Sequence, residues 1–385
     1  MSDDMTRRQL IERGAILSLP ALLAACGGGG ISGAQRTTTG AAADRTLRSP
    51  LVISNWPLYI DIDEDTKKRP TIQQFQQKYD VAVRYIEDVN DNDEFFAKIQ
   101  PSLSAGQSVD RDLIVLTDWM AGRLVRLGWL EPIDREATPN ASNLVDALAS
   151  PGWDPDRTYS LPWQSGMTGI AYNPDLTGGK VDTIEQLLTD PALKGKVTLL
   201  TEMPDTVGLV MLSNGDDPSS VEAGAFSKAI DTMQKAVDAG QIRQFTGNDY
   251  SGMLAKGDVA AAVAWSGDVV QLQADNPNLE FTLPTTGGMI WTDNMLIPKG
   301  GHVYTASTFM NFVYDPAIAA QIEAYVNYIC PVKGAREVLL AQDPDIAGNE
   351  LIFPSDETLA QVHIYDAEAA DNQDYKEQFQ ALIGA

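Results

Sequence analysis

Aromatic residues, most of them close to a carboxylate, are the groups in this 385-residue chain whose types and spacing could do chemistry. An aromatic face attracts an ammonium group, in a contact worth about 0.5–2 kcal/mol. A carboxylate accepts charge-assisted hydrogen bonds from the same group. Four such sites lie at the expected ends of strands, and together they favour an alkylammonium ligand over an anion or a sugar. The sites are Trp56 with Tyr59, Asp118 with Trp119, Trp265 with Asp268, and Trp291 with Asp293.

Residues suited to catalysis or metal binding are scarce. His302 and His363 are the two histidines, and we expect both to be structural because neither lies in a catalytic motif. The acidic run 88–94 departs from the spacing of a calcium loop. We expect Asp93 to cap a helix there, with Glu94 in its first turn. The sequence therefore predicts no catalytic residue, no metal and no cofactor.

The composition is that of a soluble globular protein with a strongly acidic surface. The chain has 53 acidic and 28 basic residues, a formal net charge of −25. A surface of that sign repels phosphate backbones, so nucleic acid is excluded as a partner, while a cationic ligand is compatible with it. With 44% hydrophobic and 21% charged residues, the chain is neither a polytopic membrane protein nor mainly disordered. Its length predicts two domains.

The N-terminus has the pattern of an export signal. Arg7 and Arg8 precede an apolar stretch, 15–25, that is too short to span a bilayer. The paired arginines resemble a twin-arginine signal, and residues 23–26 resemble a lipobox ending in Cys26. We expect 1–25 to be a signal peptide and 26–48 to be a lipidated cysteine with a flexible tether. The mature protein would then be exported to the periplasm or the outer face of the cytoplasmic membrane, anchored through Cys26.

Downstream of the tether, short apolar strands alternate with amphipathic helices. This order predicts an α/β fold with largely parallel strands, whose ligands bind beyond the carboxyl ends of the strands. The expected strands are 51–55, 81–86, 112–116, 169–172, 197–200, 259–264, 281–283 and 295–297. The expected helices are 72–79, 93–103, 183–188, 207–212, 221–239, 250–256, 306–321, 335–341 and 375–383.

Several spaced segments resemble the spermidine/putrescine-binding proteins of bacterial ABC importers. They are SNWPLYI (54–60), DLIVLTDWM (112–120), GWLEPID (128–134), LPWQSGMTGIAYN (161–173), AVAWSGDV (262–269) and WTDNMLIPKG (291–300). The resemblance implies a two-lobed, periplasmic-binding-protein-like fold of type II, with a mixed sheet flanked by helices in each lobe and the ligand cleft between them. It places 49–165 with 293–336 in lobe 1, and 166–292 with 337–385 in lobe 2. It also implies a monomeric polyamine receptor, not an enzyme, that delivers its ligand to the transmembrane subunits of an ABC permease.

The ligand residues of the family can be carried over by position. Trp56 and Tyr59 would sandwich the methylene chain of the ligand, and Asp293 would anchor an amine. The full set that the resemblance implies is Trp56, Tyr59, Thr117, Trp119, Trp265, Asp268, Trp291, Asp293 and Tyr328.

Three positions depart from the family pattern. Leu58, Met203 and Thr206 stand where many members offer an acid, although Glu202 and Asp205 are adjacent. Two retained aspartates favour a diamine such as putrescine over spermidine. Other ligands stay open for the same fold: another cationic amine, iron, thiamine or an anion. From a different class, an exported hydrolase could use Asp268 and Asp293 as its acid pair.

Overall fold

The structure is a computed structural model that describes residues 45–63 and 65–384. The expected signal peptide, 1–25, and Cys26 lie outside the described residues. The described residues form one compact unit. In the part of the chain that the structure describes, no helix has both the length and the apolar character needed to cross a bilayer.

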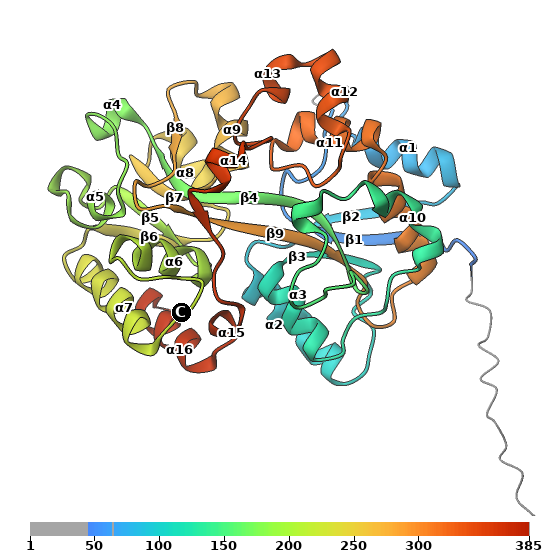
Figure 1. Cartoon of the computed structure of the whole chain (residues 1–385), viewed down its shortest axis with the longest axis horizontal. Helices are drawn as coiled ribbons and strands as arrows, with labels where there is room; N and C mark the ends of the chain where they lie inside the picture. Colours follow the sequence, from blue (N-terminus) through green and yellow to red (C-terminus); the bar gives the residue numbers. More distant parts are fainter. Residues whose placement is uncertain (1–44, 64, 385) are drawn as a thin grey trace, which may run out of the picture. The chain divides into compact units, whose positions relative to one another are not determined.

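A ten-stranded mixed sheet runs through this unit (Figure 1). Its strand order is β2-β1-β3-β9-β4-β7-β5-β6, and in addition β10 pairs with β9 and β8 with β4. The strands are β1 Leu51–Asn55, β2 Val83–Glu87, β3 Leu113–Thr117, β4 Ser160–Tyr172, β5 Val197–Leu200, β6 Ile242–Thr246, β7 Ala261–Trp265, β8 Glu280–Thr282, β9 Gly288–Leu296 and β10 Val362–His363.

The sheet has two sets of parallel strands joined by long antiparallel ones. β1 is parallel to β2 and β3, and β5 is parallel to β6 and β7, as the alternation of strands and helices predicts. We call β1, β2 and β3 with their helices the first half, and β5, β6 and β7 with theirs the second half. β9 is antiparallel to β3 and β4, and β4 is antiparallel to β7. In Figure 1, β4 and β9 cross between the two sets of parallel strands.

Helices connect and cover these strands. The helices of four residues or more are α1 Pro70–Tyr79, α2 Asn92–Ser104, α3 Asp118–Arg126, α4 Pro174–Thr177, α5 Ile184–Thr189, α6 Met203–Ser213, α7 Ala223–Asp238, α8 Tyr250–Lys256, α9 Ser266–Asp275, α10 Val303–Val313, α11 Pro316–Val326, α12 Ala335–Gln342, α13 Pro344–Ala347, α14 Asp356–Leu359, α15 Ala367–Ala370 and α16 Gln373–Ile383. Local signals place their starts. Thr183 and Gln186 form a capping box at α5, for example, and a proline opens α1, α6 and α11.

The helix predictions need three corrections. The expected single helix 306–321 is two helices, because Asp315 caps a new start and Pro316 has no N–H to continue α10. The cap of α2 is Asp91, whose side chain accepts from the Glu94 backbone N–H, while Asp93 lies in the first turn. α3 and α9, which directly follow β3 and β7, were not among the expected helices.

The strand predictions were too short in the middle of the sheet. β4 begins at Ser160 and not at residue 169, and β9 begins at Gly288 and not at residue 295. Trp291 and Asp293 therefore lie inside a strand and not between a turn and a strand. β6 was not predicted at all. Every residue of β4 is buried, so the strand has no alternation of polar and apolar residues to reveal it.

Candidate functional site

One cavity collects all nine residues that the sequence predicts for ligand binding. It lies at the carboxyl ends of β1, β3, β5 and β7, where open α/β sheets bind ligands. The cavity has a volume of about 490 Å³, part of it open to solvent. Its lining adds five residues to the predicted nine, namely Pro57, Glu202, Pro204, Asp205 and Asn248.

Five aromatic rings form a continuous wall around the cavity. Trp56 stands edge-on to Trp265, with ring centroids 5.9 Å apart, and Tyr59 stands edge-on to Tyr328 at 5.1 Å. Trp291 completes the wall, 6.2 Å from Trp265 and 5.6 Å from Tyr328. We call these five rings the aromatic collar. Trp56 and Tyr59 thus each pair with a ring from a distant segment, in the edge-to-face geometry that aromatic rings prefer.

Asp293 is held between two hydroxyl groups. It lies two residues after Trp291 in β9, so both side chains project from the same face of the sheet. The register of β3 and β9 sets Thr117 opposite Asp293, and the Thr117 hydroxyl donates to Asp293 Oδ1 at 2.7 Å. The Tyr59 hydroxyl donates to Oδ2 at 2.9 Å. Asp293 is 3% exposed, and this burial raises the pKa of its carboxyl to about 7.

Asp268 lies in the first turn of α9 and accepts hydrogen bonds from three donors. The hydroxyls of Tyr250 and Tyr328 donate to it at 2.6 and 2.7 Å, and the Asn248 amide donates at 3.1 Å. The Tyr250 hydroxyl also accepts from the Trp265 backbone N–H at 2.9 Å, which ties the carboxylate to the aromatic collar. Burial raises the pKa of Asp268 despite these bonds. Tyr250 does not line the cavity, so the sequence pattern gave no reason to select it.

Glu202 and Asp205, which the sequence left open, both line the cavity. Asp205 accepts from the Thr168 hydroxyl at 2.8 Å and from Trp265 Nε1 at 3.0 Å, and burial raises its pKa to about 6. Glu202 accepts from the backbone N–H and the side-chain amide of Asn92, both at 2.9 Å. Burial, followed by the nearby charge of Asp91, raises the pKa of Glu202 well above its usual range.

The family departures therefore do not remove acids from the cavity. Met203 and Thr206 do not line it; the Thr206 hydroxyl instead bonds to the backbone of Leu200. Leu58 is 47% exposed and also lies outside the lining. Glu202 and Asp205 thus supply carboxylates next to Met203 and Thr206, so the cavity has four acids and not only the two retained aspartates. The preference for a diamine over spermidine stays a prediction.

The cavity is anionic. Its lining contains four carboxyl groups, and within the described chain none of the lining residues is lysine, arginine or histidine. Glu202 and Asp268 lie at the N-termini of α6 and α9, whose partial positive charge favours their ionised forms. Burial nevertheless raises the pKa of all four acids. A cation with its own N–H donors would complement both the charge and the hydrogen-bond acceptors of such a site.

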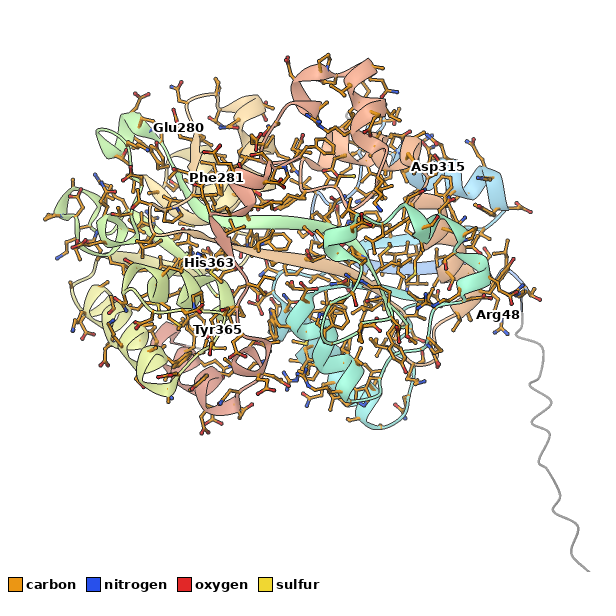
Figure 2. All side chains as sticks on the ribbon, viewed as in Figure 1. Arg48, Glu280, Phe281, Asp315, His363 and Tyr365 are labelled. Atoms are coloured by element: carbon orange, nitrogen blue, oxygen red, sulfur yellow. The ribbon has the colours of Figure 1, made fainter. Side chains whose placement is uncertain are left out.

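The two histidines lie outside the cavity lining. His302 Nδ1 is 3.0 Å from Asp112 Oδ1, at the start of α10. His363 lies in β10, which pairs with β9, on the segment that leads through Tyr365 toward α15 (Figure 2). Asp118 is not part of the lining either, although its neighbour Trp119 is.

Comparison with known proteins points to one family. Residues 71–353 match the family model described as bacterial extracellular solute-binding protein. The spermidine/putrescine-binding periplasmic protein of Escherichia coli is 23% identical over 343 residues, 89% of this chain and 93% of that protein. The putrescine-binding periplasmic protein of the same organism is 29% identical over 334 residues, 82% of this chain and 84% of that protein.

A solved structure has the same fold. A proposed spermidine/putrescine ABC transporter from Listeria monocytogenes superposes with a TM-score of 0.76 at 26% identity, covering 87% of this chain and 99% of that one. The α/β, periplasmic-binding-protein-like fold expected from the sequence is thus confirmed. The expectation of a separate mixed sheet in each lobe was wrong, because the strands of the described chain join in one large mixed sheet flanked by helices.

Gly267 is predicted to be essential for the shape of the collar. A Cβ at this position would overlap the ring of Tyr328, so Gly267→Ala should displace that ring and its bond to Asp268. We expect the variant to lose about 1–3 kcal/mol of unfolding free energy in chemical denaturation, as overpacked sites do. Gly252→Ala in α8 is the matched control, since nothing lies within 4 Å of its Cβ. Equal stability of both variants would contradict this interpretation.

The raised pKa values predict how the stability of the ligand-free protein depends on pH. A carboxyl whose pKa is raised on folding binds its proton more tightly in the folded chain, so its stabilising contribution is present at low pH and is lost as the pH rises toward 7. Removing this group by Asp293→Asn should therefore flatten the fall in unfolding free energy between pH 5 and 7, by up to about 1.4 kcal/mol per pH unit. Denaturant titrations at several pH values measure this slope. An unchanged slope in Asp293→Asn, or the same flattening in the exposed control Asp231→Asn, would refute the assignment.

Proposed function

Because the chain belongs to the bacterial extracellular solute-binding proteins, we propose that it is an extracytoplasmic receptor for a polyamine of the putrescine or spermidine type. The receptor delivers this ligand to an ABC import permease. One observation carries the proposal: four buried carboxyl groups and six aromatic rings, the five of the collar and Trp119, line one cavity to which no lysine, arginine or histidine of the described chain contributes. The names of the relatives in Escherichia coli agree with this ligand class.

The geometry suggests how the cavity would hold an amine. One ammonium donates to Asp293, whose two oxygens each accept one protein hydrogen bond and keep further lone pairs free. Asp268, Asp205 and Glu202 offer acceptors for the remaining amines. The methylene chain lies against the aromatic collar, which replaces water around it. An anion would meet four carboxylates in this cavity, and a neutral sugar would leave their charge without a partner.

The path of the chain through the sheet agrees with two lobes that close over the ligand. The expected lobe boundaries 165/166 and 292/293 fall inside β4 and β9, where Ser165 pairs with Thr292 and Gly166 with Trp291. The chain therefore crosses twice between the halves at neighbouring positions, as a two-segment hinge requires. The third crossing, at 336/337, lies in α12. We assign 49–165 with 293–336 to lobe 1, and 166–292 with 337–385 to lobe 2.

The receptor binds its ligand without transforming it. An acid pair for hydrolysis would need one carboxyl that donates a proton and one that attacks or activates water. Hydroxyl groups donate to both Asp268 and Asp293, so the two carboxyl groups have similar surroundings. Both positions suit the binding of a cation. We therefore propose a monomeric, lipid-anchored carrier with no turnover and no cofactor, which acts with the transmembrane subunits of an ABC permease.

The ligand class can be tested by thermal unfolding of the purified chain with putrescine, cadaverine, spermidine and spermine. A ligand that binds only the folded state stabilises it by about 2.7 kcal/mol at a hundredfold excess over Kd, so at least one amine should raise the melting temperature. Asp293→Asn should weaken binding by about 2–5 kcal/mol, because a buried ammonium loses its charged partner. The exposed Asp231→Asn should bind as the unmodified protein does.

Glycine betaine, maltose and ferric citrate serve as controls for the other ligand classes. A shift with one of these and with no amine would leave the receptor fold in place and overturn the ligand. Recovery of the bound amine unchanged, by mass spectrometry after prolonged incubation, supports a receptor. Conversion of the amine would reveal an enzyme.

The anchor is tested separately by Cys26→Ser expressed in a bacterial host. The unmodified chain should appear in the membrane fraction, with an acylated Cys26 as its first residue in mass spectrometry. The serine variant should lose the acyl groups and leave the membrane fraction. A chain that is processed elsewhere, or that stays on the membrane without Cys26, would disprove the lipid anchor.

A further inference from the structure

The C-terminal segment contacts both halves of the sheet. α16 packs on the second half, where Tyr375 stacks on Phe226 of α7 with ring centroids 4.1 Å apart. Phe379 of the same helix stands edge-on to Phe245 of β6 at 6.2 Å. α15 and the turn after it instead contact α3 of the first half. In Figure 1, the red C-terminal chain passes across to α15, next to α3, and then to α16, next to α7.

Lys376 is the centre of the contact with the first half. Its ammonium group donates to Asp93 Oδ1 in α2 at 2.9 Å and lies 4.6 Å from the ring centroid of Trp119 in α3. Lys376 is only 6% exposed, which is unusual for a lysine. Trp119 lines the ligand cavity. A lysine of the second half therefore supports a wall residue that the first half contributes.

A second ion pair lies on the same side of the molecule. Asp371, between α15 and α16, accepts from Arg126 at 2.5 Å and lies 3.3 Å from Arg123 Nε. Arg123 also reaches toward Asp93, at 3.6 Å, so the two ion pairs form one network. We call Lys376 and Asp371 with their partners Asp93, Trp119, Arg123 and Arg126 the C-terminal clasp.

The burial of Lys376 makes this network more than a surface salt bridge. Exposed ion pairs contribute little to stability, but a buried ammonium needs its carboxylate and its aromatic face because it has given up water. Both partners of Lys376 lie in the first half, whereas its helix is fixed to the second. Any motion that separates the halves must break these contacts and return the ammonium to solvent.

We propose that the C-terminal clasp holds the two halves together over the cavity, with Lys376 as a positioning residue for Trp119, and thereby slows release of the ligand. This inference rests on the proposed function for its ligand, but the contacts of the clasp involve only residues of this chain. The clasp acts chiefly on the dissociation rate, because the halves must separate, and these contacts must break, before the ligand can leave.

Three variants at two lysines test the clasp. Lys376→Met removes the charge and keeps most of the side-chain volume, while Lys376→Arg keeps a cation that can bind both Asp93 and Trp119. Lys235→Met is the matched control, because Lys235 is an exposed lysine of α7 that contributes no ion pair within the described chain. Stopped-flow tryptophan fluorescence gives the putrescine and spermidine dissociation rates, and hydrogen–deuterium exchange of the ligand-free proteins reports on α3 and α16.

We expect Lys376→Met to dissociate about tenfold faster, the scale of one desolvated cation–π contact. The Arg variant and the Lys235→Met control should stay close to the unmodified protein. In the ligand-free protein, Lys376→Met should accelerate exchange in α3 and α16. If Lys376→Met is poorly folded, Asp371→Asn tests the outer ion pair in the same way, with a smaller expected increase.

The two proposals fail in different ways. If the unmodified protein binds no amine, the proposed function is wrong, and the exchange of ligand-free α3 and α16 still decides on the clasp. If amines bind but Lys376→Met releases them at the unmodified rate, the clasp is overturned and the receptor is not. Equally fast release from the Met and Arg variants would also overturn it, because the charge would then be irrelevant.

Discussion

The carboxyl groups of the site are buried beside aromatic rings, and this burial determines which other groups the site must contain. Removing a carboxylate from water is unfavourable unless donors replace the water. The hydroxyls of Tyr59 and Thr117 do this for Asp293, and those of Tyr250 and Tyr328 do it for Asp268. These donors are neutral, so they compensate only in part, and the pKa values of the acids stay raised. The cavity is thus prepared for a partner that carries positive charge.

The sequence predicted which residues meet but not how the backbone brings them together. The strands that end at or just before Trp56, Thr117 and Trp265 could be predicted from apolar runs. Parallel strands bring their carboxyl ends to one edge, so these residues were expected to meet. Trp291 and Asp293 were predicted for the site yet lie inside β9, whose polar centre hides its strand character. Glu202 and Asp205 were left open because an ungapped comparison cannot tell which of several neighbouring residues faces a cavity. That choice depends on where α6 begins, which only the folded chain determines.

Charge also organises the contacts between the two halves. In the C-terminal clasp, the ammonium group of Lys376 gives up water for the ring of Trp119 and the carboxylate of Asp93. The binding mode proposed for the cavity uses the same chemistry with an ammonium group of the ligand. β4 and β9 join the halves on the other side through continuous backbone pairing. The two halves are therefore joined in two ways, by the strands β4 and β9 and by the side-chain contacts of Lys376.

Burial raises the pKa values of the cavity acids, and an ammonium group beside them would lower these pKa values again, so we expect binding of a cationic amine to release protons. Titration calorimetry of a polyamine at pH 6.5, in buffers of different ionisation enthalpy, measures the protons exchanged on binding. We predict that Asp293 alone releases about three-quarters of a proton at pH 6.5, because burial raises its pKa to about 7 and the bound ammonium group would lower it again. Binding with no proton release would contradict this prediction, since the acids would then be ionised before the ligand arrives and burial would not be the controlling constraint.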